Sequence, residues 1–175
     1  MFVAAGIDAE TRHALAARLE HVVIPGRVVP PTNWHVTLHF IGEVAPPIVD
    51  RVVHAIDEAD LGSPFRIRWG SLGAFPRPEK ATVLWVGPSS GMEELNRVAG
   101  GIGEGLETAG LPGMDRPFRP HLTLSRIRPP LDVTTLVASC DPVGVAMVVD
   151  RLELMATRFE VGATRYDVIE SFELR

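Results

Sequence analysis

Residues 34–41 read Trp-His-Val-Thr-Leu-His-Phe-Ile, and residues 118–125 read Phe-Arg-Pro-His-Leu-Thr-Leu-Ser. Both segments contain the pattern His-x-Thr-Leu, at positions 35–38 and 121–124 of a 175-residue chain. One copy of so short a pattern would carry little weight. Two copies, about half a chain length apart, indicate an internal duplication.

Each copy shows the period-two alternation of a half-buried β-strand. The polar positions are His35, Thr37 and His39 in the first copy and His121, Thr123 and Ser125 in the second. Because successive side chains of a strand point to opposite faces, we expect these polar groups on the exposed face, with imidazole and hydroxyl about 6.6 Å apart along each backbone. Two such strands lying side by side would bring two His-Thr pairs into one cleft.

Length and composition predict one domain covering residues 1–175, since 46% of the residues are hydrophobic and can form a sizeable core. We find no stretch of about 20 apolar residues that could span a membrane, and the first residues lack the basic region of a signal peptide. Cys140 is the only cysteine, which excludes an internal disulfide. We expect a monomeric cytoplasmic protein without a membrane or protein partner.

The net charge of −5 argues against non-specific binding to duplex nucleic acid, which requires many phosphate contacts. The second motif nevertheless has a basic neighbourhood, formed by Arg116, Arg119, Arg126 and Arg128. Guanidinium groups suit bidentate contacts with phosphate. We expect Arg119 and Arg126 to bind substrate, although solvated surface arginines would give the same pattern.

Hydrophobic periodicity and turn residues predict the remaining elements. Strands are expected at residues 2–8, 34–41, 65–75, 82–86, 121–127, 143–155 and 165–174. Helices are expected at residues 9–21, opened by Asp8, and at 46–60, 92–109 and 131–139.

The two halves of the chain share the order strand, helix, motif strand, helix, strand, with a break near residues 76–80. This order supports pseudo-repeats of about 1–76 and 80–175. We therefore predict an α+β, bilobal, duplicated fold, with two mainly antiparallel sheets, helices on their outer faces and a central cleft.

The glycine-rich run at residues 100–105 does not match a nucleotide-binding loop, because it lacks the spacing G-x-G-x-x-G and lies inside a helical pattern. Each glycine inside a helix costs about 1 kcal/mol relative to alanine. Close packing of this helix on its sheet is the expected reason for them.

Two histidines supply what phosphodiester cleavage needs, because imidazole titrates near neutral pH. One ring can accept a proton from an attacking water while the other donates a proton to the departing oxygen. The hydroxyl groups of Thr37 and Thr123 can hydrogen-bond the phosphate oxygens on which charge accumulates.

Metal binding is a competing interpretation. On one strand His35 and His39 would lie about 13 Å apart, too far to share a zinc ion. A site built from His35, His121 and an unidentified carboxylate stays open, as does a purely structural role for both motifs. The other histidines, His13, His21 and His54, fall in predicted helices and are expected at the surface.

The paired motifs resemble those of the 2H phosphoesterase superfamily, specifically its bacterial and archaeal RNA 2′,3′-cyclic phosphodiesterases, also called 2′-5′ RNA ligases. Residues 34–43 and 118–126 resemble the two signature segments of that family. Residues 73–76 and 83–87 resemble its central strands, so that the likeness covers essentially the whole chain.

The resemblance implies hydrolysis of a terminal 2′,3′-cyclic phosphate to a 2′-phosphomonoester, a step in RNA processing that uses neither metal nor cofactor. By position, His35 would donate a proton to the leaving 3′ oxygen and His121 would accept one from water, while Thr37 and Thr123 would hold the phosphate. A pseudo-symmetric site could also run in the reverse sense, which would favour the 3′-phosphate.

Two further alternatives stay open at this stage. The cleft could bind a nucleotide without turnover, or the enzyme could act on 2′-5′ linkages or on a cyclic phosphate of a small nucleotide. Base preference depends on the rim of the cleft, where Phe75, Trp85 and Phe118 are stacking candidates that would equally suit the core.

Overall fold

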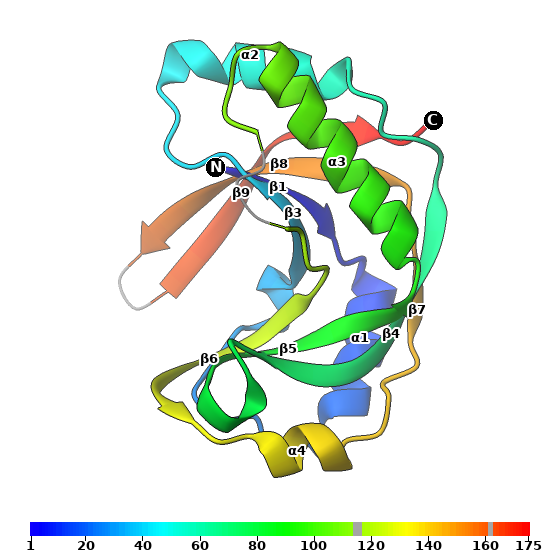
Figure 1. Ribbon diagram of the computed structural model, residues 1–175, viewed down its shortest axis with the longest axis vertical. Helices are drawn as coiled ribbons and strands as arrows, with labels where there is room; N and C mark the ends of the chain where they lie inside the picture. Colours follow the sequence, from blue (N-terminus) through cyan, green and yellow to red (C-terminus); the bar gives the residue numbers. More distant parts are fainter. Residues whose placement is uncertain (114–116, 161–162) are drawn as a thin grey trace.

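A curled antiparallel sheet runs through the centre of the molecule (Figure 1). The computed structural model describes the chain except residues 114–116 and 161–162. In this part, nine strands form the sheet in the order β7-β4-β5-β6-β3-β1-β8-β9, with β2 paired to β6. The strands are β1 (Phe2–Gly6), β2 (Arg27–Val28), β3 (His35–Phe40), β4 (Phe65–Phe75), β5 (Ala81–Ser90), β6 (Leu122–Leu131), β7 (Ala146–Val149), β8 (Arg151–Glu160) and β9 (Ala163–Glu173).

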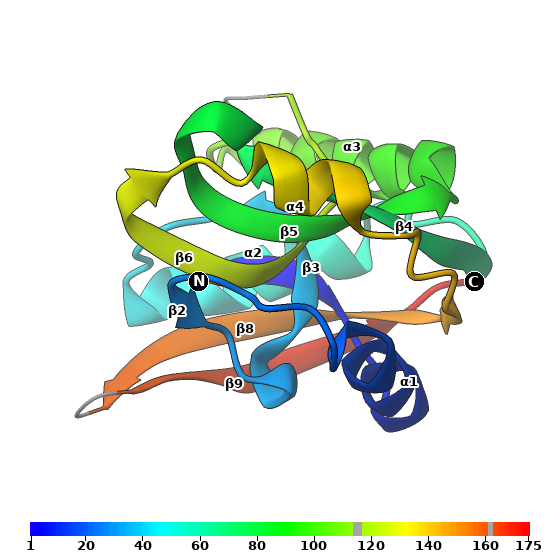
Figure 2. The ribbon, with the colours of Figure 1, turned by 90° about the horizontal axis from the view of Figure 1, so that it is seen from below.

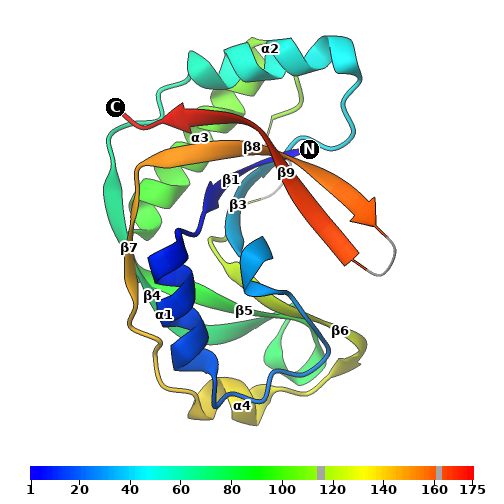
Figure 3. The same cartoon turned by 180° about the vertical axis from the view of Figure 1, so that it is seen from behind.

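The helices are α1 (Ala9–Leu19), α2 (Pro46–Asp57), α3 (Met92–Thr108) and α4 (Thr134–Ser139), and two short 3₁₀ turns occupy Pro31–Asn33 and Pro78–Lys80. Helix α3 packs against α2 and β3 on the side of the sheet that faces the viewer in Figure 1. Helix α1 lies on the opposite side (Figure 3), and α4 lies beside β4 (Figure 2). Within the described residues, no helix is long and apolar enough to cross a membrane.

The strands form two lobes that meet where β3 pairs with β6 through Val36 and Leu122. One lobe contains β7, β4, β5 and β6, and the other contains β3, β1, β8 and β9. The predicted α+β class, antiparallel pairing and bilobal plan are confirmed. The two predicted sheets, however, join edge to edge into one.

Each lobe takes strands from both halves of the chain. Strand β4 belongs to the first half, yet it lies between β5 and β7 of the second half. Conversely, β8 and β9 of the second half extend the lobe of β1 and β3. The duplicated halves therefore interlock, and neither half alone contains a complete lobe.

The element bounds follow the sequence pattern closely, except that β2 was not expected and that residues 143–155 do not form one strand. Residues 143–155 were expected to form a single strand, but the structure has β7 and β8 there, separated by the exposed Asp150. Strand β7 pairs with β4 and β8 pairs with β1. The chain thus crosses between lobes at Asp150 while its hydrophobic alternation continues, so periodicity alone could not detect the break.

The first helix begins where the sequence predicts. The side chain of Asp8 caps α1 by accepting a hydrogen bond from the backbone N–H of Thr11 at 2.8 Å. Helix α1 buries Thr11, Leu15 and Leu19, which lie on one face at helical spacing.

The glycines of α3 have a different role from the one expected. A Cβ atom on Gly101 would lie 2.5 Å from the carbonyl oxygen of Asp60, and one on Gly105 would lie 2.7 Å from that of Ala55. Both carbonyls belong to α2 or to the residues just after it. Gly101 and Gly105 therefore permit close packing of α3 on α2 and the residues after it, and for these two the expected helix–sheet packing is wrong.

Candidate active site

The two motifs meet at the junction of the lobes. Val36 and Leu122 pair in antiparallel register, so that their neighbours also lie opposite each other: His35 faces Thr123, and Thr37 faces His121. All four of these side chains line one cleft of about 350 Å³. Each histidine therefore has a threonine of its own motif along the strand and a threonine of the other motif across the pair.

His35 is held in a defined orientation on β3. Its Nδ1 donates a hydrogen bond to the carbonyl oxygen of Asn33 at 2.8 Å, and its Nε2 lies 3.0 Å from Oγ1 of Thr37. The ring stacks on Phe2 at 4.9 Å between centroids and meets the edge of Tyr166 at 5.0 Å. Because a carbonyl can only accept, Nδ1 carries the proton, and Nε2 is the nitrogen that gains or loses one.

His121 repeats this arrangement on β6. Its Nδ1 donates to the carbonyl oxygen of Arg119 at 2.7 Å, again two residues earlier in the chain. The ring contacts Phe75 at 4.9 Å and Trp85 at 6.2 Å. Gly73 leaves the space for this indole, because a Cβ atom there would lie 2.2 Å from a ring carbon of Trp85.

The pKa of each imidazole lies below its ordinary value, mainly because burial disfavours the charged form. The hydrogen bond to the carbonyl of Asn33 or Arg119 opposes this effect. The charge of His121 lowers the pKa of His35 further, and Arg126 lowers the pKa of both rings. Both histidines are therefore neutral near pH 7 in the unliganded protein, and a bound anion would favour protonation of one ring.

The predicted site arginines lie at different places. Arg126 is exposed and lines the cleft together with both histidines. Arg119 lines a neighbouring cavity of about 770 Å³, which the cleft adjoins at Thr37, Phe40 and His121. Arg128 is exposed at the far end of β6 from the histidines, and Arg116 lies outside the described residues.

Two expected site residues turn away from the exposed face. His39 is only 3% exposed at the edge of the neighbouring cavity, and Ser125 is 0% exposed. The prediction that both extend the polar face of their strands is therefore wrong.

The cause is a bulge in each motif strand. Opposite β1, the register passes from Thr37 to His39, and opposite β5 it passes from Thr123 to Ser125. The extra residue is the leucine of His-x-Thr-Leu in both copies, and it reverses the alternation beyond that point. The bulge buries the fourth residue after each histidine and turns the fifth outward.

That fifth residue is Phe40 in the first copy and Arg126 in the second. Phe40 is 73% exposed and lines the cleft, although strict alternation had placed it on the buried face. The predicted stacking candidates, Phe75, Trp85 and Phe118, are only partly exposed, and the first two pack on His121.

The sequence patterns also missed several residues of the cleft. Phe2 and Tyr166 hold His35, and Phe159, 86% exposed, lies on the rim. The role of Asn33 could have been inferred from the repeat, because Asn33 and Arg119 occupy the same position, two residues before the histidine of each motif. The surface prediction for His13, His21 and His54 is confirmed by their exposure.

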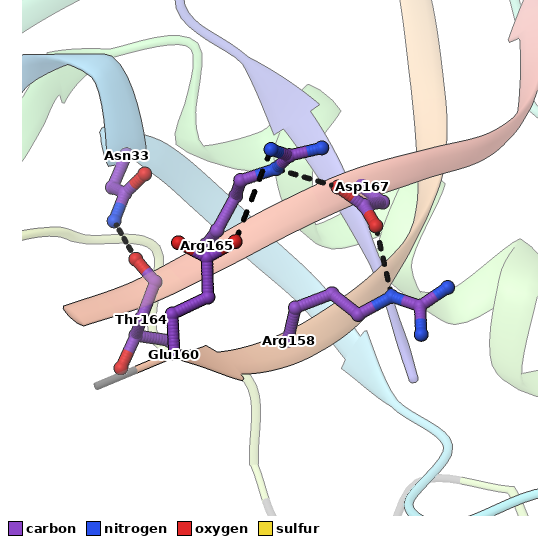
Figure 4. A network of polar contacts seen from close by, with 6 residues as sticks. All are labelled: Asn33, Arg158, Glu160, Thr164, Arg165 and Asp167. Atoms are coloured by element: carbon purple, nitrogen blue, oxygen red, sulfur yellow. Dashed lines mark hydrogen bonds and ion pairs between the residues drawn. The ribbon is translucent and has the colours of Figure 1, made fainter.

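Polar contacts brace the β8–β9 pair and join it to Asn33 (Figure 4). Nδ2 of Asn33 donates to the carbonyl oxygen of Thr164 at 2.7 Å, while the carbonyl of Asn33 holds the imidazole. Asp167 accepts from Arg158 and from Arg165, each at 2.9 Å. Among the described residues, no three His, Cys, Asp or Glu side chains gather as a metal site.

The chain is similar to known proteins over most of its length. The model of the LigT-like phosphoesterase family matches the chain twice, at residues 7–85 and 86–166. An RNA 2′,3′-cyclic phosphodiesterase of Aeropyrum pernix is 35% identical over 119 residues, which cover 68% of this chain and 67% of that protein. One of Thermus thermophilus is 31% identical over 185 residues, covering 100% of this chain and 90% of that protein. The crystal structure of Escherichia coli LigT complexed with 3′-AMP has a TM-score of 0.79 and 25% identity, covering 99% of this chain and 96% of that one.

Proposed function

Because this chain belongs to the LigT-like phosphoesterase family, we propose that it hydrolyses the 2′,3′-cyclic phosphate of RNA ends or nucleotides to the 2′-phosphomonoester. The relatives named RNA 2′,3′-cyclic phosphodiesterase support this choice of reaction. One observation carries the proposal: both histidines are fixed through Nδ1 by a carbonyl oxygen, so that both Nε2 atoms serve one cleft.

In the proposed reaction, Nε2 of His121 accepts a proton from water as the water oxygen bonds to phosphorus. The bond from phosphorus to the 3′ oxygen breaks, and the protonated Nε2 of His35 donates its proton to that oxygen. The ring that begins neutral thus ends protonated, and the other ends neutral. Exchange of one proton with solvent restores the starting state.

The lowered pKa values suit this division of work. A neutral histidine is a competent base in the unliganded protein, and the anionic substrate supplies the negative charge that stabilises one imidazolium. Because the two sites interact, the pair holds one proton more readily than two.

The other side chains of the cleft have matching roles. The hydroxyls of Thr37 and Thr123 and the guanidinium of Arg126 can bind the non-bridging oxygens as charge builds on them. The exposed ring of Phe40, in the same cleft, offers a face on which a base can stack. We propose that these side chains stabilise the transition state without a metal ion.

The proposal is tested with adenosine 2′,3′-cyclic monophosphate after exhaustive dialysis against EDTA. We expect full turnover, and phosphorus NMR should identify the product as the 2′-phosphate. A predominant 3′-phosphate would mean that His35 acts as the base and His121 as the acid. Activity that disappears on dialysis and returns with a divalent metal would contradict the two-histidine mechanism, and nucleotide binding without turnover would indicate a binding module instead.

A further inference from the structure

The cleft continues into a second hollow beside β2. This groove has a volume of about 240 Å³, and its walls come from residues 27–30 on one side and from β9 on the other. It shares Val29, Asn33, Arg126, Thr164 and Tyr166 with the cleft, and Arg27 lines only the groove. We call it the Arg27 groove.

Positive charge gathers at the junction of cleft and groove. Arg27 and Arg126 are directly opposed in the antiparallel pairing of β2 with β6, so their side chains leave the same face of the sheet. An anion lying over both side chains would be attracted by both charges. Among the described residues that line the cleft and the groove, these two arginines are the permanently charged ones, in a chain of net charge −5.

Another hollow, distinct from the Arg27 groove, adjoins the cleft at Asn33 and His35, and its lining carries more acidic than basic side chains. Its lining includes the carboxylates of Asp8, Asp150 and Glu153 together with two arginines. A polyanion leaving the cleft would therefore meet a small net negative charge on that side and the positive charge of the arginines at the Arg27 groove.

The two ends of the cleft also differ in character. At one end it shares Thr37, Phe40 and His121 with the large cavity, and at the other it shares Arg126 with the groove. A nucleotide whose cyclic phosphate lies between the histidines can place its base toward Phe40. We take the 5′ oxygen to lie on the other side, toward Arg126 and the groove.

We propose that the Arg27 groove binds the phosphodiester on the 5′ side of the nucleotide that is cleaved, so that the preferred substrate is an RNA chain ending in a cyclic phosphate. This inference rests on the proposed function. Arg27 binds the second phosphate, and Arg126 lies between the two phosphates. Asn33 holds β9 as the opposite wall through its bond to Thr164 (Figure 4).

The experiment compares two substrates that differ by one nucleotide and one charge. These are adenosine 2′,3′-cyclic monophosphate and the dinucleotide ApA ending in a 2′,3′-cyclic phosphate. We expect the wild-type protein to prefer the dinucleotide by about tenfold in kcat/KM, the scale of one charge-assisted contact. A dinucleotide with an uncharged methylphosphonate linkage should lose this preference.

The Arg27→Gln variant should abolish the preference while changing kcat/KM for the mononucleotide by less than about twofold. For the dinucleotide, the slope of log KM against log salt should fall by about 0.7, the value for one contact to a single strand. Arg51→Gln is the matched control, because Arg51 is exposed on α2, outside the lining of the cleft and the groove. This variant should behave as wild type.

Retention of the dinucleotide preference in Arg27→Gln would overturn the inference, as would equal cleavage of the methylphosphonate compound. If neither substrate is turned over, the proposed reaction fails. Affinity measurements then test separately whether the Arg27 groove binds a phosphodiester. The affinity of ApA 2′-phosphate should then fall about tenfold in Arg27→Gln while that of adenosine 2′-monophosphate stays constant. Equal affinities of the wild-type protein and Arg27→Gln for the dinucleotide would overturn the proposed role of the groove.

Discussion

The two motif strands, β3 and β6, share one backbone design but carry different side chains at the fifth position after the histidine. In both, Nδ1 of the histidine donates to the carbonyl two residues earlier, and the leucine of His-x-Thr-Leu is the bulged residue. The bulge turns the fifth residue after the histidine into the cleft, where the first copy has Phe40 and the second has Arg126. The duplication thus kept the scaffold of each histidine and separated an aromatic side from a cationic side.

The surroundings of the two rings differ as well. His35 lies against Phe2 and Tyr166, which come from opposite ends of the chain, whereas His121 lies against Phe75 and Trp85 of neighbouring strands. Both environments exclude water from one face of the imidazole. The same lowering of pKa is therefore reached with different residues.

The largest expected effect tests whether the two histidines act as one unit. His35→Ala and His121→Ala should each lower kcat by about 100-fold or more, as expected for the loss of a positioned proton-transfer group. The double variant should be much less active than wild type. Its loss in kcat should nevertheless be far smaller than the two single losses multiplied together. Circular dichroism and melting curves control for folding, and near-normal turnover in either single variant would contradict the mechanism.

The next effect separates the fifth positions of the two copies. Arg126→Gln should lower kcat/KM by about 10- to 100-fold for every substrate, because it removes a charged contact with the phosphate. Phe40→Ala should raise KM by about tenfold for nucleotides, since it removes a stacking surface. Ribose 2′,3′-cyclic phosphate, which has no base, is the control for Phe40→Ala. An equal loss on that compound would contradict the stacking role.

The pH profile gives a smaller but more diagnostic difference. Burial and Arg126 lower the pKa of both histidines, so the bell-shaped profile of kcat/KM should have its maximum on the acid side of pH 6.5, the ordinary pKa of histidine. Removing the positive charge in Arg126→Gln should raise both pKa values and move both limbs to higher pH. Arg126→Lys and Phe40→Ala should leave the limbs in place. Unmoved limbs in Arg126→Gln would mean that its charge does not act on the histidines.

Sequence patterns were sufficient for the scaffold of this site. The repeated motif predicted that His35, Thr37, His121 and Thr123 share a cleft, and they do. The bounds predicted for β4 also match the structure, and a proline precedes and follows that strand.

The same patterns failed where the backbone departs from a regular pleat. An alternation rule assumes that every residue pairs, so it could not foresee the bulges, and it therefore misplaced His39, Phe40 and Ser125. Long-range pairing was equally inaccessible. Nothing local in the sequence brings Tyr166 beside His35 or places the two-residue strand at Arg27 opposite Arg126.

The smallest expected effect on activity concerns the fourth position after each histidine, which the bulge buries. Ser125→Ala should change kcat/KM by less than about threefold, since the side chain lies in the core and not in the cleft. Its hydroxyl has no hydrogen-bond partner among the described residues, so the free energy of unfolding should stay within about 1 kcal/mol of wild type or rise. Thr123→Val, two residues away but facing the cleft, is the matched variant and should lose about tenfold in kcat/KM with little change in stability. If Ser125→Ala lost as much activity as Thr123→Val, the side chain would have to reach the substrate. That result would contradict the conclusion that the bulge places Ser125 in the core while Thr123 faces the cleft.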